Sequence, residues 1–482
     1  MQSKERFTII GLVIRDKRLR KTKTCIVSPL VFGKLSSKFA DNFLEERRKH
    51  DMRGHQIITI FLIAALLLAG CDKGNNQGST LMEADPVQTG GKTKLVVATI
   101  SSNLNLMGLD NVLRKTVSRF NQENPDYYVE ILDYSQNGTI SQEDALTKLN
   151  TEIISGKFPA DMLCFSNISP YPYITRSLML ELQEKISQDP SFSLDDIAAL
   201  KAFFVQDGLY FLGSSFIFTT AVGDSSNFGD RYGWTLQEYL DFEASNPEGW
   251  IIYNITQDYF FRCVASRYMR TAIDWQAGTC DFDNTNFIGI LEASKRIMDK
   301  PESDDHILYA SGGDSITSGE LIVDFVYVTN FYNLAQAQRN SSCKLSYVGW
   351  PTADGSCGTD IDVSCPVGIL AQSNNIDGCW EFLKYMVMSG GDDYSFSTYM
   401  PKLKAAYDAA MKDEDAPFQL TEGDREVFFN LLSVIENLSI YDAPAQNIIL
   451  NESTDSFNGR RTAAETAKIV QSKISLYMAE QK

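Results

Sequence analysis

Short polar and aromatic side chains follow a predicted strand, at a place where a ligand could meet them. Ser166 and Asn167 come directly after the strand predicted at 161–165, and Tyr171 and Tyr173 lie two residues apart in the next loop. Hydroxyl and amide groups form directional hydrogen bonds, and flat aromatic rings pack on apolar faces such as the C–H face of a pyranose. These four side chains could therefore bind a sugar, or equally pack within their own loop.

Histidine is too rare for most acid/base or metal chemistry. The three histidines are His50, His55 and His306, and the first two fall in an N-terminal region that we expect to be absent from the mature protein. A single histidine cannot build a His-rich metal site. We therefore expect no metal and no cofactor, and we assign no catalytic residues.

The cysteine pattern does not predict a complete disulfide framework. Seven cysteines follow Cys71, an odd number, and none of them forms a CxxC pair. Cys164 lies in an apolar run and is expected to pack as a small hydrophobic residue. For an exported protein, a bridge from Cys357 to Cys343 or to Cys365 remains open.

Length and charge narrow the class of protein. The chain has 482 residues and is 44% hydrophobic, which is too long for one compact core and too apolar for disorder, so we expect two lobes. Residues 1–71 carry a net charge of +8, whereas residues 72–482 carry −26. A body that acidic repels phosphate, so nucleic acid is not an expected partner.

The elements that position the candidate residues alternate between strand and helix. Apolar runs predict strands at 94–100, 128–132 and 161–165, and helical periodicity predicts a helix in each interval. This order predicts a parallel α/β sheet, and no glycine-rich phosphate loop opens either helix. Ligands of such sheets lie beyond the carboxyl ends of the strands, here at 101–105, 134–138 and 166–173.

Two later segments could cross between lobes, and two helix starts are marked by capping boxes. The long uncharged stretch 210–222 and the stretch 345–351 are the crossing candidates. Thr235 and Thr462 each precede a glutamate by three residues, the pattern of a capping box. Trp234 stands where a hydrophobic staple is expected, so we predict a structural role for it.

The N-terminal region reads as a removable signal. Residues 57–68 form an apolar run that is short of the roughly 20 residues of a membrane-spanning helix. The run is preceded by Arg53 and followed by Leu68-Ala69-Gly70-Cys71, which looks like a bacterial lipobox whose cysteine receives a lipid. We predict a lipoprotein signal peptide at 52–70 and a lipidated Cys71 that opens a flexible tether to residue 93; a short buried helix is the alternative.

Residues 1–51 do not fit a signal peptide, which begins at the start methionine. Codons for Glu46-Arg47-Arg48 could form a purine-rich ribosome-binding sequence at a suitable distance from a start at Met52. We therefore expect residues 1–51 to be an upstream extension outside the protein. A cytosolic extension with a retained signal anchor is the alternative.

From about residue 92 to the end, the order of several segments resembles bacterial extracellular solute-binding proteins of the maltose-binding type (family 1) that serve ABC importers. The resemblance lies in the lipobox and tether, FNQENPDYYVEI, TEIISGKFPADML, YFLGSSF, GWTLQEYLDF, DWQAGTCDFDNTNF, YVGWPTADG, WEFLKYMV and GRRTAAETAKIVQSKISLYMAEQ. It implies an α/β, two-lobed, periplasmic-binding-protein-like fold of type II with a hinge of crossing strands. It places crossovers near 213–221 and 348–351 and a return near 399–401.

The expected lobes follow from this resemblance. Lobe 1 comprises 94–213 and 352–398, and lobe 2 comprises 214–351 and 399–482. Residues 325–332 resemble the family segment that enters the cleft from the second lobe, which makes Asn330, Phe331 and Tyr332 ligand-binding candidates. Trp350 at the hinge is a further candidate, with a buried hinge tryptophan as the alternative.

The resemblance implies a lipid-anchored receptor that performs no chemistry on its ligand. It would lie on the extracytoplasmic face of the cell membrane as a monomer, capture a solute, expected to be a sugar or oligosaccharide, and deliver it to the permease subunits of an ABC importer. A surface-anchored carbohydrate hydrolase and a solute sensor that partners a membrane receptor are the alternatives.

Overall fold

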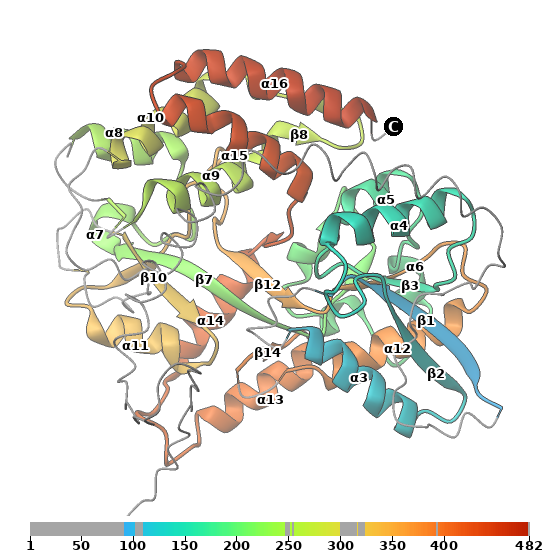
Figure 1. The fold of residues 1–482 in the computed structure, drawn as a ribbon. Helices are drawn as coiled ribbons and strands as arrows, with labels where there is room; N and C mark the ends of the chain where they lie inside the picture. The colour runs from blue at the N-terminus through green and yellow to red at the C-terminus, as the bar shows by residue number, and fades with distance from the viewer. Residues whose placement is uncertain are drawn as a thin grey trace, which may run out of the picture. The chain divides into compact units, whose positions relative to one another are not determined.

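The computed structural model describes residues 91–101, 109–245, 251–252, 255–298, 316, 323–391 and 394–480. Two mixed β-sheets organise these residues, each with its own helices (Figure 1). The predicted signal segment, Cys71, most of the tether and His306 lie outside the described residues.

The first sheet has the strand order β2-β1-β3-β13-β6. Its bounds are β1 (Thr93–Thr99), β2 (Tyr127–Asp133), β3 (Met162–Cys164), β6 (Phe211–Leu212) and β13 (Val367–Ile369). The first three strands are parallel, as their spacing predicted, and β13 runs antiparallel to β3 and to β6. The last five residues of β1 are buried, as expected for a parallel strand with both faces covered.

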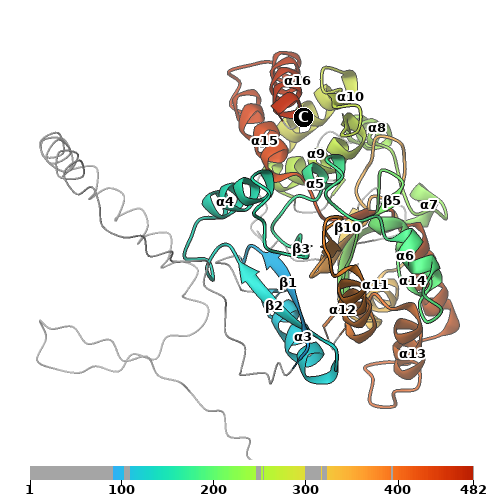
Figure 2. The ribbon, with the colours of Figure 1, turned by 90° about the vertical axis from the view of Figure 1, so that its right-hand side faces the viewer.

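Helices from two parts of the chain accompany the first sheet. They are α3 (Leu109–Glu123), α4 (Gln142–Ile154), α5 (Tyr171–Thr175), α6 (Gln183–Ser187) and α12 (Ile376–Ser389). Figure 2 shows α3 beside β1 and β2, with α4 at the other end of these strands. Ser141 starts α4 by accepting a hydrogen bond from the Asp144 amide.

The second sheet is built around the long strand β7 (Ser215–Asp224). Its order is β10 (Val323–Val328), β7, β12 (Asp360–Ser364) and β15 (Asn437–Leu438), while β11 (Leu345–Tyr347) and β14 (Phe396–Ser397) also pair with β7. Phe216 and Phe218 of β7 pack in an aromatic core with Phe396 and Phe428.

The larger set of helices belongs with the second sheet. They are α7 (Ser225–Phe228), α8 (Leu236–Ser245), α9 (Gln257–Ala272), α10 (Thr285–Met298), α11 (Tyr332–Asn340), α13 (Met400–Ala410), α14 (Glu422–Val434), α15 (Ala443–Phe457) and α16 (Ala463–Glu480). A short hairpin of β8 (Ile273–Asp274) and β9 (Thr279–Cys280) follows α9. A second short hairpin joins β4 (Phe204–Val205) to β5 (Gly208–Leu209), just after the 3-10 helices Leu194–Asp196 and Leu200–Phe203.

The chain passes between the sheets at three places, and this confirms the predicted two-lobed α/β fold with crossing strands. The first passage, at Gly213–Ser214 between β6 and β7, lies inside the predicted crossing stretch. The second lies at Cys365–Pro366 between β12 and β13, and the third lies between α12 and β14.

The expected second crossover at 348–351 was wrong. Gly349 has a φ of 64° and turns the chain, so that the Trp350 amide donates to the Gly358 carbonyl at 3.2 Å and residues 350–358 return to the second sheet. As a result, β12 and β14 pair with β7 although they lie within 352–398, the range expected in lobe 1. The remaining lobe boundaries stay a prediction.

Both predicted capping boxes are present. The Thr235 amide and hydroxyl donate to Glu238, and the Thr462 amide and hydroxyl donate to Glu465. Trp234 is 1% exposed and its indole Nε1 donates to the Gly349 carbonyl at 2.9 Å, which confirms its structural role.

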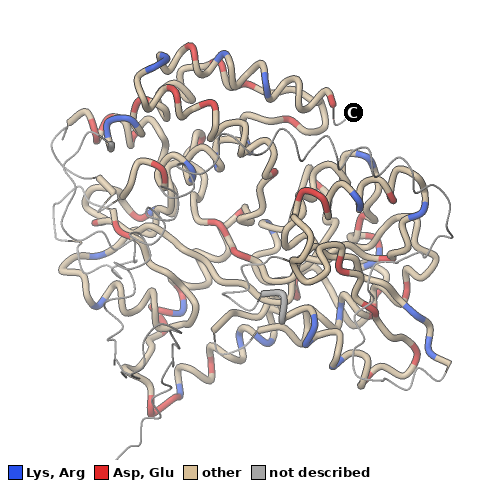
Figure 3. Tube along the Cα trace, in the orientation of Figure 1, with Lys and Arg blue, Asp and Glu red and all other residues tan. Residues whose placement is uncertain are grey.

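Acidic and basic residues are interspersed along the described chain in Figure 3.

Candidate functional site

A cavity of about 220 Å³ lies beside the second sheet. It is formed by α9, by strands β7 and β12, by Trp350 and by the segment that leads into α15. The lining residues are Thr219, Tyr259, Arg262, Cys263, Ser266, Arg267, Trp350, Asp360, Asp362, Ser439, Tyr441 and Gln446. Charged, hydroxyl and aromatic groups thus converge in one small space, as in sites for polar small molecules.

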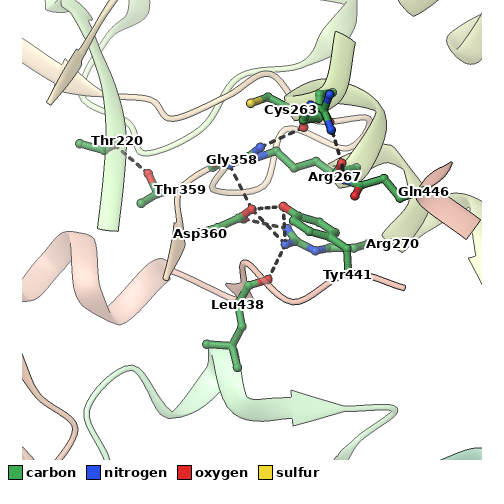
Figure 4. Close-up of polar contacts among 12 residues, drawn as sticks. Thr220, Cys263, Arg267, Arg270, Gly358, Thr359, Asp360, Leu438, Tyr441 and Gln446 are labelled. Carbon is green, nitrogen blue, oxygen red and sulfur yellow. Dashed lines mark hydrogen bonds and ion pairs between the residues drawn. The ribbon is translucent and has the colours of Figure 1, made fainter. Parts of the chain in front are cut away.

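Asp360 is the centre of the charged part of this cavity (Figure 4). Its carboxylate is bound bidentately by Arg270 at 2.7 and 3.0 Å, by Arg267 at 3.0 Å, and by the Tyr441 hydroxyl, which donates to it. Bidentate arginine–carboxylate pairs of this kind hold their geometry firmly. We refer to Arg267, Arg270, Asp360 and Tyr441 as the Asp360 cluster.

The charged groups of the Asp360 cluster stabilise one another in their ionised forms. Asp360 is 3% exposed, and burial alone would raise its pKa, but the two guanidinium groups and the Tyr441 hydroxyl hold that pKa below its ordinary value. Burial would also lower the pKa of Arg270, but Asp360 raises it, so the pair is ionised. The cluster can therefore present a fixed, charged wall to a ligand.

The helical repeat of α9 explains how two arginines reach one carboxylate. Arg267 and Arg270 are three residues apart and so lie on the same face of the helix. Arg267 also donates to the Gly358 carbonyl at 3.0 Å and to the Cys263 carbonyl at 2.9 Å, while Arg270 donates to the Leu438 carbonyl at 2.6 Å. These bonds fix α9 against β12 and against the segment before α15.

Three side chains near the cluster remain open to solvent, and we call them the rim: Tyr259, Tyr327 and Asp362. Asp362 is exposed on β12, two residues after Asp360, while Tyr259 and Tyr327 are 39% and 43% exposed. Surrounding protein, together with the charge of Asp360, raises the pKa of Asp362. The charge of Asp362 in turn helps to raise the pKa of both tyrosines, which shows that the three groups are near one another.

A stacked aromatic pair connects helix α5, which accompanies the first sheet, to the β8–β9 hairpin that follows α9. Tyr171 of α5 and Trp275 of the β8–β9 turn are stacked, with ring centroids 5.2 Å apart and planes at 9°. Burial raises the pKa of Tyr171, Arg270 lowers it, and Asp442 and Asp360 raise it further, so its hydroxyl lies in the field of the Asp360 cluster. The pair therefore lies near the Asp360 cluster, although neither ring is among the residues that line the cavity.

Of the eight ligand-binding residues predicted from the sequence, the structure brings Tyr171 and Trp350 to this region. Trp350 is 2% exposed, lies 4.6 Å from the Phe325 ring by centroid, and has the Arg267 guanidinium 5.3 Å from its own ring centre. It lines the cavity and is also a buried core residue, and its role as a ligand contact stays a prediction.

The other candidates in the first sheet's loop have structural contacts. Tyr173 is 4% exposed and donates from its hydroxyl to the Asn150 side chain at 2.7 Å. Asn167 donates to the Ile100 carbonyl at 2.8 Å and so ties the ends of β1 and β3 together. Ser166 is exposed, with its hydroxyl 3.3 Å from the Cys164 sulfur. These contacts match the loop-packing interpretation.

Asn330, Phe331 and Tyr332 lie away from the cavity lining, at the start of α11. Asn330 accepts from the Tyr332 amide, Phe331 packs against Phe396, and Tyr332 donates to the Ala410 carbonyl at 3.1 Å. The end of β10 explains why these three residues do not line the cavity. β10 ends at Val328, before Asn330. Within the strand, side chains alternate between two faces, and Phe325 and Tyr327 lie on the face that is near Trp350 and Asp362.

The Asp360 cluster and Trp275 were not identified from the sequence. A possible signal was the Asp360-x-Asp362 pattern in a strand, where charged residues are unusual, together with two arginines at helical spacing. Neither signal predicts that the two segments meet, because they are separated by about 90 residues of chain.

The described part of the chain has no metal-binding cluster, no disulfide and no helix that could span a membrane. There, no group of three or more His, Cys, Asp and Glu side chains is arranged to hold a metal ion. The seven described cysteines are thiols rather than disulfides, so the bridges considered for Cys357 do not occur in this structure. Nor does any described helix have the length and apolar character needed to span a bilayer.

Comparisons with known proteins find similarity only among solved structures. No family model and no curated protein matches the chain. A periplasmic oligogalacturonide-binding protein from Yersinia enterocolitica is 13% identical, with a TM-score of 0.48, over 81% of this chain and 100% of that one. An ABC substrate-binding protein from Listeria monocytogenes, solved with cycloalternan, is 15% identical, with a TM-score of 0.45, over 80% and 99%.

A family 1 extracellular solute-binding protein from Bifidobacterium longum subsp. infantis is likewise 15% identical, with a TM-score of 0.45, over 80% of this chain and 99% of that one. Each of these proteins is covered nearly from end to end by the present chain. At TM-scores below 0.5, the two-sheet topology and the three passages described above remain the support for the fold.

Proposed function

We propose that this chain is a solute-binding protein, anchored by a lipid on Cys71 to the extracytoplasmic face of the cell membrane, that captures a sugar or oligosaccharide for an ABC importer. The observation that carries the proposal is the cavity itself. Rigid charged groups, an exposed carboxylate and the rings of Tyr259, Trp350 and Tyr441 line it, and the stacked pair of Tyr171 and Trp275 lies in the field of the same charged cluster. Sugars are bound by this combination of flat apolar faces and directional polar groups.

Each part of the site has a role in binding. The Asp360 cluster keeps the cavity wall rigid, so little conformational entropy is lost when a ligand binds. Asp362 accepts hydrogen bonds from solute hydroxyls, and the rings of Tyr171, Trp275 and the rim tyrosines pack on the C–H faces of the sugar. Among the similar proteins, one is an oligogalacturonide-binding protein and another was solved with cycloalternan, which agrees with this ligand class.

The same geometry disfavours the hydrolase alternative. A retaining or inverting glycosidase needs two carboxyl groups that both face the scissile bond. Asp362 is exposed, but Asp360 is 3% exposed and already bound by two arginines and a tyrosine.

The partner that co-purifies with the ligand-bound protein would distinguish the importer proposal from the sensor alternative. A permease would indicate delivery to an importer, and a sensor kinase would indicate signalling.

The test is a thermal-shift screen of mono- and oligosaccharides, followed by calorimetry on variants with the sugar that binds. Because each aromatic contact contributes about 0.5 to 1.5 kcal/mol beyond area burial, Tyr171→Ala and Trp275→Ala should each weaken binding roughly two- to tenfold. Tyr332→Ala is the matched control, since Tyr332 contacts Ala410 and Phe418 instead. Normal binding by Tyr171→Ala and Trp275→Ala, with loss in Tyr332→Ala, would contradict the proposed site.

A further inference from the structure

One side of the second sheet is partly open to solvent beside the cavity. On β7, Phe216 and Phe218 are buried, whereas the alternate residues Ile217 and Thr219 are half-buried. The sheet therefore has its aromatic core on one side and a partly open surface on the other. Thr219 also lines the cavity, so the open side of the sheet is the side that faces the cavity.

The strand register brings Tyr327 and Asp362 to this open side. Thr219 pairs with Tyr327 of β10 and with Asp360 of β12, and directly opposite residues of antiparallel strands project to the same side of a sheet. Asp362 pairs with Ile217 and therefore projects to that side as well. Asp362 is exposed and Tyr327 is 43% exposed, so a solute can reach both side chains.

Asp362 is the carboxylate of this side that remains available to a solute. Both oxygens of Asp360 are already bound within the Asp360 cluster, whereas no lysine or arginine of the described chain forms an ion pair with Asp362. The two arginines of the cluster are directed at Asp360 and at backbone carbonyl oxygens, and Arg262 of the cavity wall is paired with Asp258 at 3.2 Å. A cation in the cavity would thus be attracted by Asp362, and an anion would be repelled by it.

Aromatic rings near Asp362 also suit a cation. Tyr259 of α9 lines the cavity together with Asp362, and its ring centroid lies 5.8 Å from that of Trp350. Tyr327 follows Phe325 on the same side of β10, and the Phe325 ring centroid lies 4.6 Å from that of Trp350. The faces of tyrosine rings attract positive charge, so exposed rings beside a free carboxylate favour an ammonium group.

We propose, on the basis of the proposed function, that the solute is an amino sugar, a saccharide with a free amine that is protonated at neutral pH. Asp362 accepts a charge-assisted hydrogen bond from the ammonium group, and the rings of Tyr259 and Tyr327 lie beside that group. An N-acetyl or hydroxyl group at the same position carries no charge and forms only a neutral-donor hydrogen bond. Asp362 therefore selects the amino sugar over its neutral counterparts.

The experiment measures binding to the full chain by titration calorimetry with matched sets of sugars. Each set contains one hexose unit as its free amine, its N-acetyl form and its hydroxyl form, as the monosaccharide and in short α- and β-linked oligosaccharides. The free amine should bind roughly tenfold or more tightly than the two neutral forms. Raised salt should weaken binding of the free amine much more than that of the neutral forms.

Asp362→Asn tests the assigned residue, because this change removes the charge and keeps the size of the side chain. In this variant the free amine should bind no more tightly than the neutral forms, and the salt dependence should disappear. Asp377→Asn is the matched control, since Asp377 of α12 is an exposed aspartate that pairs with Lys185 and does not line the cavity. Its preference for the free amine should equal that of the wild type.

Neutral sugars that bind as tightly as their free-amine forms would overturn this inference and leave the proposed sugar-binding function in place. An undiminished preference for the free amine in Asp362→Asn would overturn the role of Asp362. Binding of spermidine without binding of any sugar would overturn the amino-sugar assignment and the proposed function together, and so would the absence of binding by every compound.

Discussion

Asp360 joins three segments of the chain through one carboxylate. Its partners come from α9 and from the segment between β15 and α15, while Asp360 itself lies on β12. Removal of one member of a buried ion network leaves the remaining charges without a partner, and this is more costly than loss of the network as a whole. The stability of the cavity wall should therefore depend on this side chain.

Asp360→Asn is expected to destabilise the protein by about 3 to 5 kcal/mol, because Arg267 and Arg270 would keep their charges in a buried place. Chemical denaturation of the variant and of the wild type measures the difference. Asp362→Asn is the matched control on the same strand and should be near wild type in stability, since Asp362 is exposed, but weaker in sugar binding. Equal stability of Asp360→Asn and wild type would show that the cluster is not structural.

The buried carboxyl of Asp442 should affect the pH dependence of stability in the opposite direction to Asp360, because its pKa is raised and that of Asp360 is lowered. It is buried at the N-terminus of α15 and accepts a hydrogen bond from the Ala445 amide at 2.9 Å. Burial raises its pKa above the ordinary value of 3.8, and the hydrogen bond from the Ala445 amide offsets this rise in part. The folded state thus binds a proton more tightly than the unfolded state, and ionisation of Asp442 lowers stability as pH rises from about 3.8 through its folded pKa.

Asp442→Asn keeps a side chain that can cap the helix and removes the buried charge. The variant should be more stable than the wild type at pH 7, and this advantage should shrink as pH falls, because the raised pKa lets the wild-type carboxyl take up a proton at a higher pH than an ordinary aspartate does. Thermal melts of both proteins between pH 4 and 8 measure the gap. A gap that is constant with pH would show that the carboxyl does not titrate in this range.

At the scale of elements, the loop 350–358 and the start of α8 support each other. Trp234 precedes the Thr235 capping box, and its indole binds the Gly349 carbonyl at the turn that sends Trp350 towards the cavity. The Thr352 amide in turn donates to the Trp234 carbonyl at 3.0 Å. The Trp234 contacts thus join this loop to the start of α8, while Trp350 is held at the cavity by its own packing against Phe325 and Arg267.

Trp234→Ala should lower stability by about 3 to 5 kcal/mol, as large-to-small changes of buried aromatic residues do. Sugar affinity should change much less, because Trp234 does not line the cavity. Differential scanning calorimetry gives the first quantity and titration calorimetry gives the second. Loss of binding with an unchanged melting temperature would mean that Trp234 acts in the site.

At the scale of the whole molecule, three passages between the two sheets accompany contacts between segments that are far apart in the chain. Tyr171 lies in α5 beside the first sheet, whereas Trp275 and the Asp360 cluster belong with the second. A ligand that contacts both groups would link the two sheets through the cavity as well as through the backbone. A solute receptor signals ligand binding to a membrane partner through a change in its surface. A ligand that contacts groups from both sheets could cause such a change by favouring one arrangement of the two sheets.

Lipid anchoring is a prediction for the whole molecule that rests on the sequence. The intact mass of membrane-extracted protein should correspond to a chain that begins at Cys71 with a lipid attached, because the lipobox cysteine receives the lipid before cleavage. Cys71→Ser should accumulate as an unprocessed precursor, while Cys25→Ser should have no effect. Peptides from residues 1–51 on the mature protein would contradict a start at Met52.

Local patterns in the sequence were sufficient to predict the first three strands and two helix starts. The runs that form β1, β2 and β3 and the starts of α8 and α16 depend on residues within a few positions of one another, such as Thr235 with Glu238 and Thr462 with Glu465. Hydrophobic period and capping chemistry act over this short range, so the sequence determines them directly. The first passage between the sheets followed from the length of one apolar stretch in the same way.

The site depended on contacts between segments that are far apart in the chain. Tyr171, Trp275, Asp360 and Tyr441 come from four separate elements, and no local pattern records which of them will meet. Asn330 and Tyr332 show the converse, because their residue types suit a sugar site but the end of β10 at Val328 directs them into the contacts of α11. The tertiary structure alone decides these positions, because strand register and helix packing set which side chains share a cavity.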